Sequence, residues 1–245
     1  MSVYDLLFKK DLGKWSQEFN KYKKAIKDIS KRIDECEKKY GSYYPEKENL
    51  FKAFELTPLE KVKVVIVGQD PYPSLLANGK CRAQGLSFSV SKEDSIPGSL
   101  KNIYKEIKND FPMFQEPKHG DISYLAKREG VFLFNQSLSY CPTNPKCYLN
   151  LWNRFTNIVI NILNENIDNC IYILWGKKAE NLAESIKSRE IITGVHPSPI
   201  SANRGFFNKK YFLKINITLK NQNKKQINFN EDEKILPTYL ENLKN

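Results

Sequence analysis

The chain has 245 residues, of which 40% are hydrophobic and 27% are charged. These proportions are typical of a folded globular protein and exclude a disordered one. No apolar stretch is long enough to span a membrane as a helix, and the first residues lack the basic and apolar regions of a secretory signal. The net charge of +11 favours a polyanionic partner.

The cysteines and histidines argue against a disulfide framework and against a metal site. The five cysteines are odd in number and form no C-x-x-C pair, so we expect reduced thiols in an intracellular protein. The two histidines, His119 and His196, are too few for a His-rich metal site. Cys141 and Cys147 have a spacing that matches no common zinc pattern, and we therefore expect no metal.

The first predicted elements are one long helix and four strands. Apolar residues in 14–40 recur at alternating spacings of three and four, which predicts one amphipathic helix laid against the core. After Pro58 the pattern changes to short, almost continuously apolar runs, as expected of strands buried on both faces. These runs are 62–67, 131–134, 170–175 and 191–193.

Helical patterns separate the apolar runs. Residues 100–107 carry their apolar side chains on one face, and Asp121 and Gly130 are placed to begin and end a helix over 122–129. Strands that alternate with helices predict an α/β fold with a central four-stranded parallel sheet flanked by helices. We expect a single domain over 1–245, with a loosely attached tail at 231–245. The remaining predicted helices are 150–165, 178–187 and 206–220.

Polar residues come after the predicted strands, at the points where ligands bind in parallel sheets. The first strand is followed by Gln69 and Asp70, the second by Asn135, and the fourth by His196. Each residue alone has a structural explanation as a turn former or a cap. Their recurrence at equivalent strand ends favours a shared site.

The chemistry of this site is narrowed by the motifs that the sequence lacks. There is no G-x-G-x-x-G and no phosphate-binding G-x-x-x-x-G-K-[ST] loop, and 85–89 (GLSFS) lacks the final glycine of a hydrolase elbow. An aspartate and a histidine without a nucleophile indicate water activation or charge stabilisation. Residues 191–230 contain seven Lys or Arg and no acid. This charge favours a nucleic-acid partner held by its phosphates.

At these residues the sequence resembles the family-one uracil-DNA glycosylases, roughly from Trp15 to Phe229. The resemblance implies a glycosylase-like α/β fold and an enzyme that flips uracil out of DNA and hydrolyses its N-glycosidic bond, starting base-excision repair. It implies no cofactor, because water is the nucleophile. The matching stretches are VVIVGQDPY at 64–72, GLSFSV at 85–90, GVFLFN at 130–135, HPSPIS at 196–201 and RGFF at 204–207.

The resemblance also implies roles for the pocket residues. Asp70 would orient the attacking water and stabilise the cationic sugar, and His196 would hydrogen-bond the leaving uracil anion with help from the backbone of Gln69. The remaining positions would recognise the base: Asn135 would read its polar edge, Phe88 would stack on it, and Tyr72 would exclude the methyl group of thymine.

Three loops would hold the DNA backbone, at 96–99, 176–177 and 196–198. Ile200 stands at the position of the family's wedge, which fills the space left by the flipped base. The residues matched to DNA contacts are Ser99, Lys177, Ser198, Ile200 and Arg204.

The sequence departs from the family pattern at several points. Pro73 stands where a histidine is usual, Lys177 replaces a serine, and the segment between Tyr72 and Phe88 is longer. Two alternatives therefore stay open: a DNA-binding processivity subunit with weak catalysis, and a glycosylase for another damaged base. We expect a monomer that acts on single- or double-stranded uracil-containing DNA and can bind a protein inhibitor. It would be cytoplasmic in a bacterium, and nuclear or in a viral factory otherwise.

Overall fold

A computed structural model describes residues 1–235 and contains a four-stranded sheet at its centre. The strands are β1 (Val64–Gly68), β2 (Val131–Asn135), β3 (Ile171–Trp175) and β4 (Ile191–Gly194). All neighbouring pairs are parallel, and the spatial order is β2-β1-β3-β4. The predicted fold class is confirmed. The carboxyl ends of all four strands therefore meet at one edge.

The four strands differ in burial. Every residue of β1, β2 and β3 is buried, as their continuous apolar sequences predict. The prediction is wrong for β4, whose residues are half-buried or exposed. Strands β2 and β4 both form edges of the sheet. Helices at Lys52–Leu56 and Ser123–Glu129 pack on β2, whereas within the described residues no helix packs as extensively on β4.

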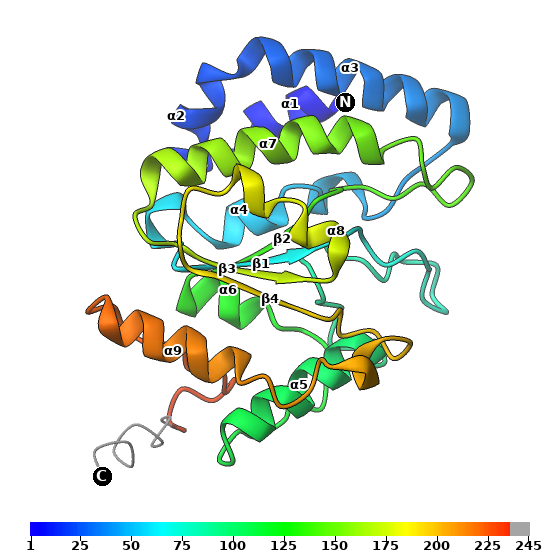
Figure 1. Cartoon of the computed structure of the whole chain (residues 1–245). Coiled ribbons are helices and arrows are strands. Elements are labelled where there is room, and N and C mark those ends of the chain that lie inside the picture. Colours follow the sequence, from blue (N-terminus) through cyan, green and yellow to red (C-terminus); the bar gives the residue numbers. More distant parts are fainter. Residues whose placement is uncertain (236–245) are drawn as a thin grey trace.

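Helices α1 (Val3–Phe8), α2 (Lys14–Lys21), α3 (Lys23–Tyr40) and α7 (Leu149–Asn166) lie on one side of the sheet (Figure 1). Helix α3 packs on α7, and α1 packs on α3. The predicted single helix over 14–40 is two helices, because the backbone leaves helical geometry at Tyr22 (φ −107°, ψ 13°). This break lets α2 bury Trp15 and Phe19 in the core while α3 follows α7.

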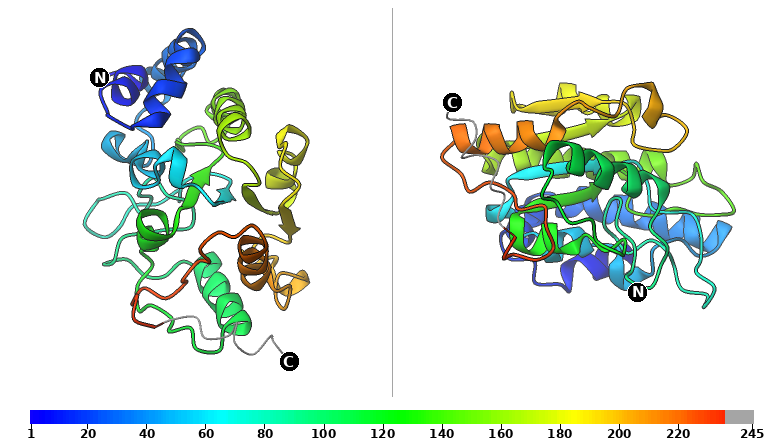
Figure 2. Two further views of the ribbon diagram at one scale, coloured as in Figure 1. Left: turned by 90° about the vertical axis from the view of Figure 1, so that its left-hand side faces the viewer. Right: turned by 90° about the horizontal axis from the view of Figure 1, so that it is seen from below.

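Helices α5 (Gly98–Asp110), α6 (Ser123–Glu129) and α9 (Tyr211–Asn221) lie on the other side, where α5 and α9 pack together (Figure 2). Helix α6 ends as predicted, because Gly130 adopts the left-handed conformation. It begins one residue later than predicted, at Ser123, and its N-cap is Ile122; Asp121 stands just before this cap and accepts a hydrogen bond from the Ser123 N–H (2.9 Å).

Two of the other helix predictions need correction. The helix predicted over 206–220 starts only at Tyr211, because Lys210 has left-handed backbone angles that a helix cannot include. The helix predicted over 178–187 is the short α8 (Lys177–Glu180) followed by a 3-10 turn, Ala183–Ser185. Short elements were not predicted from the sequence; they are α1, α4 (Lys52–Leu56) and 3-10 turns at Lys47–Asn49, Leu59–Lys61 and Ala202–Arg204.

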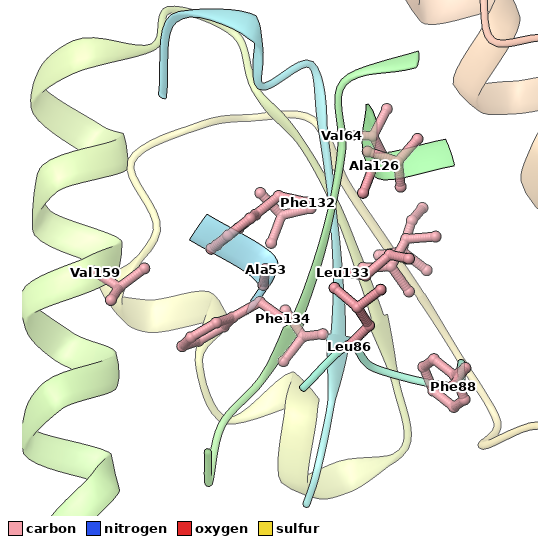
Figure 3. Packing of buried hydrophobic residues seen from close by; sticks show 14 of the residues in the cluster. Ala53, Val64, Leu86, Phe88, Ala126, Phe132, Leu133, Phe134 and Val159 are labelled. Carbon is pink, nitrogen blue, oxygen red and sulfur yellow. The ribbon is translucent and has the colours of Figure 1, made fainter. Parts of the chain in front are cut away.

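The core lies on both faces of the sheet and alternates along β2. Phe132 and Phe134 point to the side of α7 and α4, whereas Leu133 points to the side of α6 (Figure 3). The two phenylalanine rings stack with centroids 5.3 Å apart. This packing fixes β2 between two helical layers and holds the strand end in place.

Only part of the predicted tail at 231–245 can be examined, because residues 236–245 lie outside the described part of the chain. At its start, Glu231 pairs with Lys92 and His119, each at 2.9 Å. Among the helices within 1–235, none combines the length and apolar character that crossing a membrane requires. The same residues contain no group of His, Cys, Asp and Glu arranged to hold a metal ion.

Trp15 provides a test of how α2 is anchored. Its side chain is fully buried, and its ring N–H donates to the carbonyl of Thr57 (3.0 Å). We expect Trp15→Ala to lower the free energy of unfolding by about 3–5 kcal/mol, because it leaves a cavity and an unpaired carbonyl. Urea unfolding would measure the loss. Lys14→Ala, at an exposed neighbouring position, should change stability by less than about 0.5 kcal/mol.

Candidate active site

A pocket of about 160 Å³ opens at the carboxyl edge of the sheet. It is smaller than the ~300 Å³ or more typical of sites for drug-sized ligands, so it accommodates a small planar group. The six pocket residues inferred from the sequence all line it, and so does Ser99, which was matched to a DNA contact. They are Gln69, Asp70, Tyr72, Phe88, Ser99, Asn135 and His196.

Asn135 reaches the pocket because its neighbour on β1 has no side chain. Gly68 and Asn135 are paired in the β1–β2 register, and a Cβ atom on Gly68 would lie 2.1 Å from the Asn135 Oδ1. Only glycine therefore permits this position of the amide. Asn135 is 6% exposed, so its side-chain oxygen and nitrogen are available chiefly to a molecule inside the pocket.

Asp70 is a half-buried carboxylate just beyond β1. The Gln69 side-chain amide donates to its Oδ2 (3.0 Å), and the Gln69 carbonyl accepts from the Ser137 N–H (2.9 Å). Burial raises the pKa of Asp70, while the Gln69 hydrogen bond and the charge of Lys178 act in the opposite direction. A partly desolvated carboxylate interacts more strongly with a positive charge than one in water does.

His196 follows β4, and its ring orientation is fixed by its own loop. The Nδ1 atom accepts a hydrogen bond from the backbone N–H of Ser198 (3.1 Å). Since an accepting nitrogen carries no proton, the proton of the neutral ring lies on Nε2. Burial also lowers the pKa of His196. The imidazole is therefore a neutral donor at neutral pH.

Two aromatic residues form the apolar walls of the pocket. Phe88 adopts a positive φ of 62°, which is a strained conformation for a residue with a side chain. Its ring lies edge-on to Trp175 (5.8 Å between centroids) and near His196 (6.0 Å). The Tyr72 hydroxyl donates to the Phe88 carbonyl (3.3 Å), which joins the two walls.

The rim of the pocket is held by a small hydrogen-bond network. The Ser201 hydroxyl donates to the His196 carbonyl (2.8 Å) and lies 2.7 Å from the Ser198 hydroxyl. The Asn102 amide of α5 donates to the Pro197 carbonyl (2.8 Å). This network fixes the loop that carries His196 and connects it to the helix that begins at Gly98.

The other positions matched to DNA contacts lie at the same edge. Lys177 is exposed at the start of α8, directly after β3, and Arg204 is exposed in the turn that follows the His196 loop. Ile200 is 84% exposed, an unusual environment for a large apolar residue.

Two residues of this site were not identified from the sequence. Asn102 was part of a helical pattern with no sign that it would meet a loop almost a hundred residues away. Lys178 influences Asp70 through its charge, and its carbonyl is held by the side chain of Gln136 (3.0 Å). The Gly-Lys-Lys sequence after β3 was the only local signal for it.

A parallel sheet with a polar pocket at its carboxyl edge places the chain among the α/β enzymes. The family model that matches, over residues 54–220, is described as the uracil DNA glycosylase superfamily. The chain belongs to this family.

Relatives with known names agree over most of the chain. A uracil-DNA glycosylase of Aliivibrio fischeri is 39% identical over 212 residues, covering 85% of this chain and 92% of the relative. Uracil-DNA glycosylase 1 of Listeria innocua is 42% identical over 212 residues, with coverage of 84% and 91%. The crystal structure of mimivirus uracil-DNA glycosylase has a TM-score of 0.82 at 30% identity, covering 88% of this chain and 86% of that one.

The protonation of His196 can be tested directly. Because burial lowers the pKa of the folded-state ring, we expect its titration midpoint to lie below the ordinary value of ~6.5. Nitrogen-15 NMR of labelled histidine should show the proton on Nε2 at neutral pH. The unfolded chain binds the proton more readily, so this group should lower stability as the pH falls below ~6.5. A midpoint above that value would contradict the assignment.

Proposed function

We propose that this protein excises uracil from DNA by hydrolysing the N-glycosidic bond, leaving an abasic site as the first step of base-excision repair. The observation that carries the proposal is the convergence of Asp70, Asn135 and His196 on one base-sized pocket. Membership of the uracil DNA glycosylase superfamily supports it. Water is the nucleophile, so besides water the proposed reaction uses only side chains and backbone groups of this chain.

Recognition requires the base to leave the helix, because the pocket is too narrow for a duplex. The Asn135 amide offers one donor and one acceptor, which match the N3–H and O4 groups of uracil and mismatch the amino group of cytosine. Phe88 stacks on the base. Tyr72 occupies the space that the 5-methyl group of thymine would need, and its bond to the Phe88 carbonyl keeps it there.

The chemistry follows from where charge develops. As the bond between the sugar C1′ and uracil N1 breaks, its electron pair goes to the base, which becomes an anion, and the sugar becomes cationic. The Asp70 carboxylate stabilises the cation, orients the water whose oxygen bonds to C1′ and accepts the proton that this water loses. The His196 Nε2–H and the Gln69 backbone N–H donate to uracil O2, where the negative charge collects.

The DNA strand is held on both sides of the flipped nucleotide. Ser99 and Ser198 contact phosphates from loops joined by the Asn102 hydrogen bond, and Lys177 and Arg204 add positive charge. Ile200 enters the base stack. These loops need no second subunit, so the protein acts as a monomer on single- or double-stranded DNA.

A protein inhibitor would use the same edge. A structure of a mimivirus relative, which resembles this chain with a TM-score of 0.82, is a complex with the glycosylase inhibitor UGI. An inhibitor that covers the exposed Ile200 and the cationic rim would compete with DNA.

Uracil release from an oligonucleotide with a single uracil, measured in EDTA, tests the activity. We expect the wild-type protein to release uracil. Asp70→Asn should reduce turnover by ~10²–10³, because loss of one preorganised electrostatic group costs about that much, while DNA binding stays largely intact.

Two outcomes would contradict the proposal. Asp70→Asn activity within threefold of wild type would remove Asp70 from its role. A wild-type protein that binds DNA and releases no uracil would indicate a DNA-binding subunit, and release of another base from lesion oligonucleotides would indicate another substrate.

The proposed role of Ile200 as a wedge in the base stack can be tested by substitution. Unpairing and unstacking the base costs a few kcal/mol in a duplex and less in a single strand. We therefore expect Ile200→Ala to slow excision most from U·A pairs, less from U·G mismatches and least from single strands. Time courses on the three substrates would measure the order.

The matched control is Met113→Ala, which also removes an exposed apolar side chain, 65% accessible, beyond the far end of α5. It should leave all three rates unchanged. Equal losses for Ile200→Ala on every substrate, at an unchanged melting temperature, would exclude the wedge role.

A further inference from the structure

A second cleft lies at the amino edge of the sheet, opposite the pocket. It has a volume of about 560 Å³ and is formed by the segments that lead into β1, β2 and β3 and by the chain after α9. Five cationic side chains and three carboxylates line it. The cations are Lys61, Lys63, Lys127, Arg128 and Lys224.

The cations of the cleft outnumber its carboxylates, and only one of them, Arg128, forms ion pairs among the described residues. Arg128 pairs with Glu129 (2.7 Å) and Glu233 (3.5 Å). Within residues 1–235, by contrast, none of the four lysines forms an ion pair. Two of these lysines form hydrogen bonds to uncharged backbone groups. Lys63 donates to the Lys225 carbonyl (3.0 Å), and Lys224 donates to the Asp168 carbonyl (3.1 Å).

Burial and neighbouring positive charges destabilise the charged form of Lys63. It is half-buried, and burial lowers the pKa of its ammonium group; attraction to Glu129 opposes the shift, and repulsion from Lys225 and Lys224 adds to it. Like charges held close together in a partly desolvated cleft are stabilised by an anion between them. The cleft is therefore suited to a ligand with several negative charges.

Helix α9 connects this cleft to the active-site edge. It begins beside α5 near the pocket rim and ends at the amino edge (Figure 1). Its eleven residues span ~16 Å at 1.5 Å per residue. Exposed lysines occur before, along and after it, with no acid between them; they are Lys209, Lys210, Lys214, Lys220 and Lys225.

The acids closest to the start of α9 are already engaged. Glu106 accepts hydrogen bonds from the backbone N–H groups of Asn208 and Lys209 (2.8 Å each). Asp110 accepts from those of Phe212 and Leu213 (2.9 and 3.2 Å). These carboxylates bond to the backbone, and only the charge of Lys210 acts on one of them, Asp110. Within residues 1–235 the exposed lysines in and beside α9 form no ion pair.

We propose that the amino-edge cleft and the exposed lysines of α9 form a second nucleic-acid site, which binds the phosphates of a DNA segment other than the one in the pocket. One strand presents a phosphate about every 3.4 Å, so a segment along α9 would offer about five. Continuity with the edge that binds the substrate favours DNA over an acidic protein. The inference rests on DNA as the substrate, but it concerns a different surface.

Such a site would hold neighbouring DNA while the pocket examines one nucleotide. Contacts to phosphates carry no sequence information, so the second segment can be any DNA. A protein bound to two segments can release one and keep the other, which makes transfer between them faster than full dissociation.

The test compares two triple variants that each lose three positive charges. The site variant is Lys61→Gln, Lys127→Gln and Lys224→Gln. The control is Lys24→Gln, Lys27→Gln and Lys31→Gln, on the exposed face of α3, across the sheet from α9. Each protein is first saturated with a short single strand carrying a non-hydrolysable uracil analogue. Binding of a labelled uracil-free duplex of forty pairs is then measured against salt concentration.

We expect the saturated wild-type protein and the control to bind the duplex, and the site variant to bind roughly tenfold more weakly. Its log K against log salt should be shallower by about 0.9 for each lysine that contacts a phosphate. Uracil excision from a strand of the same length with an ordinary, hydrolysable uracil, without the duplex, should be the same for all three proteins, which separates this test from that of the proposed function.

Three results would overturn the proposal. The first is an equal loss of duplex binding in the site variant and the control. The second is no duplex binding by the saturated wild-type protein. The third is a site variant that loses binding of inorganic pyrophosphate but binds the duplex with the same dependence on salt as the wild-type protein. The last result would assign the cleft to a small anion.

Discussion

The pocket depends on one pair of residues at the end of two buried strands. Gly68 and Asn135 stand side by side in the β1–β2 register, and the missing side chain of Gly68 provides the space that the Asn135 amide occupies. Burial of both strands under two helical layers fixes this register, because a slip by one residue would turn the phenylalanines of β2 to the wrong face. The position of the Asn135 amide in the pocket is thus set by the packing of the core.

Much of the fold could be predicted from local sequence, and so could the pocket residues that directly follow the strands; Tyr72, Phe88 and Ser99 were inferred only from the family resemblance. Continuous apolar runs mark buried strands wherever they occur, and the residues after each strand must lie at one edge of a parallel sheet. The half-exposed β4 could not be recognised, because its apolar sequence does not show that helices cover this edge strand less than they cover β2. The break at Tyr22 and the late start of α9 depend on backbone angles that apolar spacing does not encode.

The parts of the site that sequence analysis missed are those that act through space. Asn102 and Lys178 influence His196 and Asp70 from other elements, and no spacing rule connects them. Phe88 is similar: its place as a pocket wall was inferred from a resemblance, but its strained φ of 62° is maintained by contacts with Trp175 and Tyr72. Strain of this kind persists where surrounding contacts over-determine a conformation.

The exposure of Ile200 has a consequence for how the family can diversify. Because little of this side chain touches the rest of the protein, replacing it should change the free energy of unfolding by no more than about 0.5 kcal/mol. Most positions around the pocket are coupled to the core, where a change in function also costs stability. Ile200 is free of that coupling, so drift and selection can sample many side chains at this tip, which the proposed function assigns to the base stack, without a compensating mutation elsewhere.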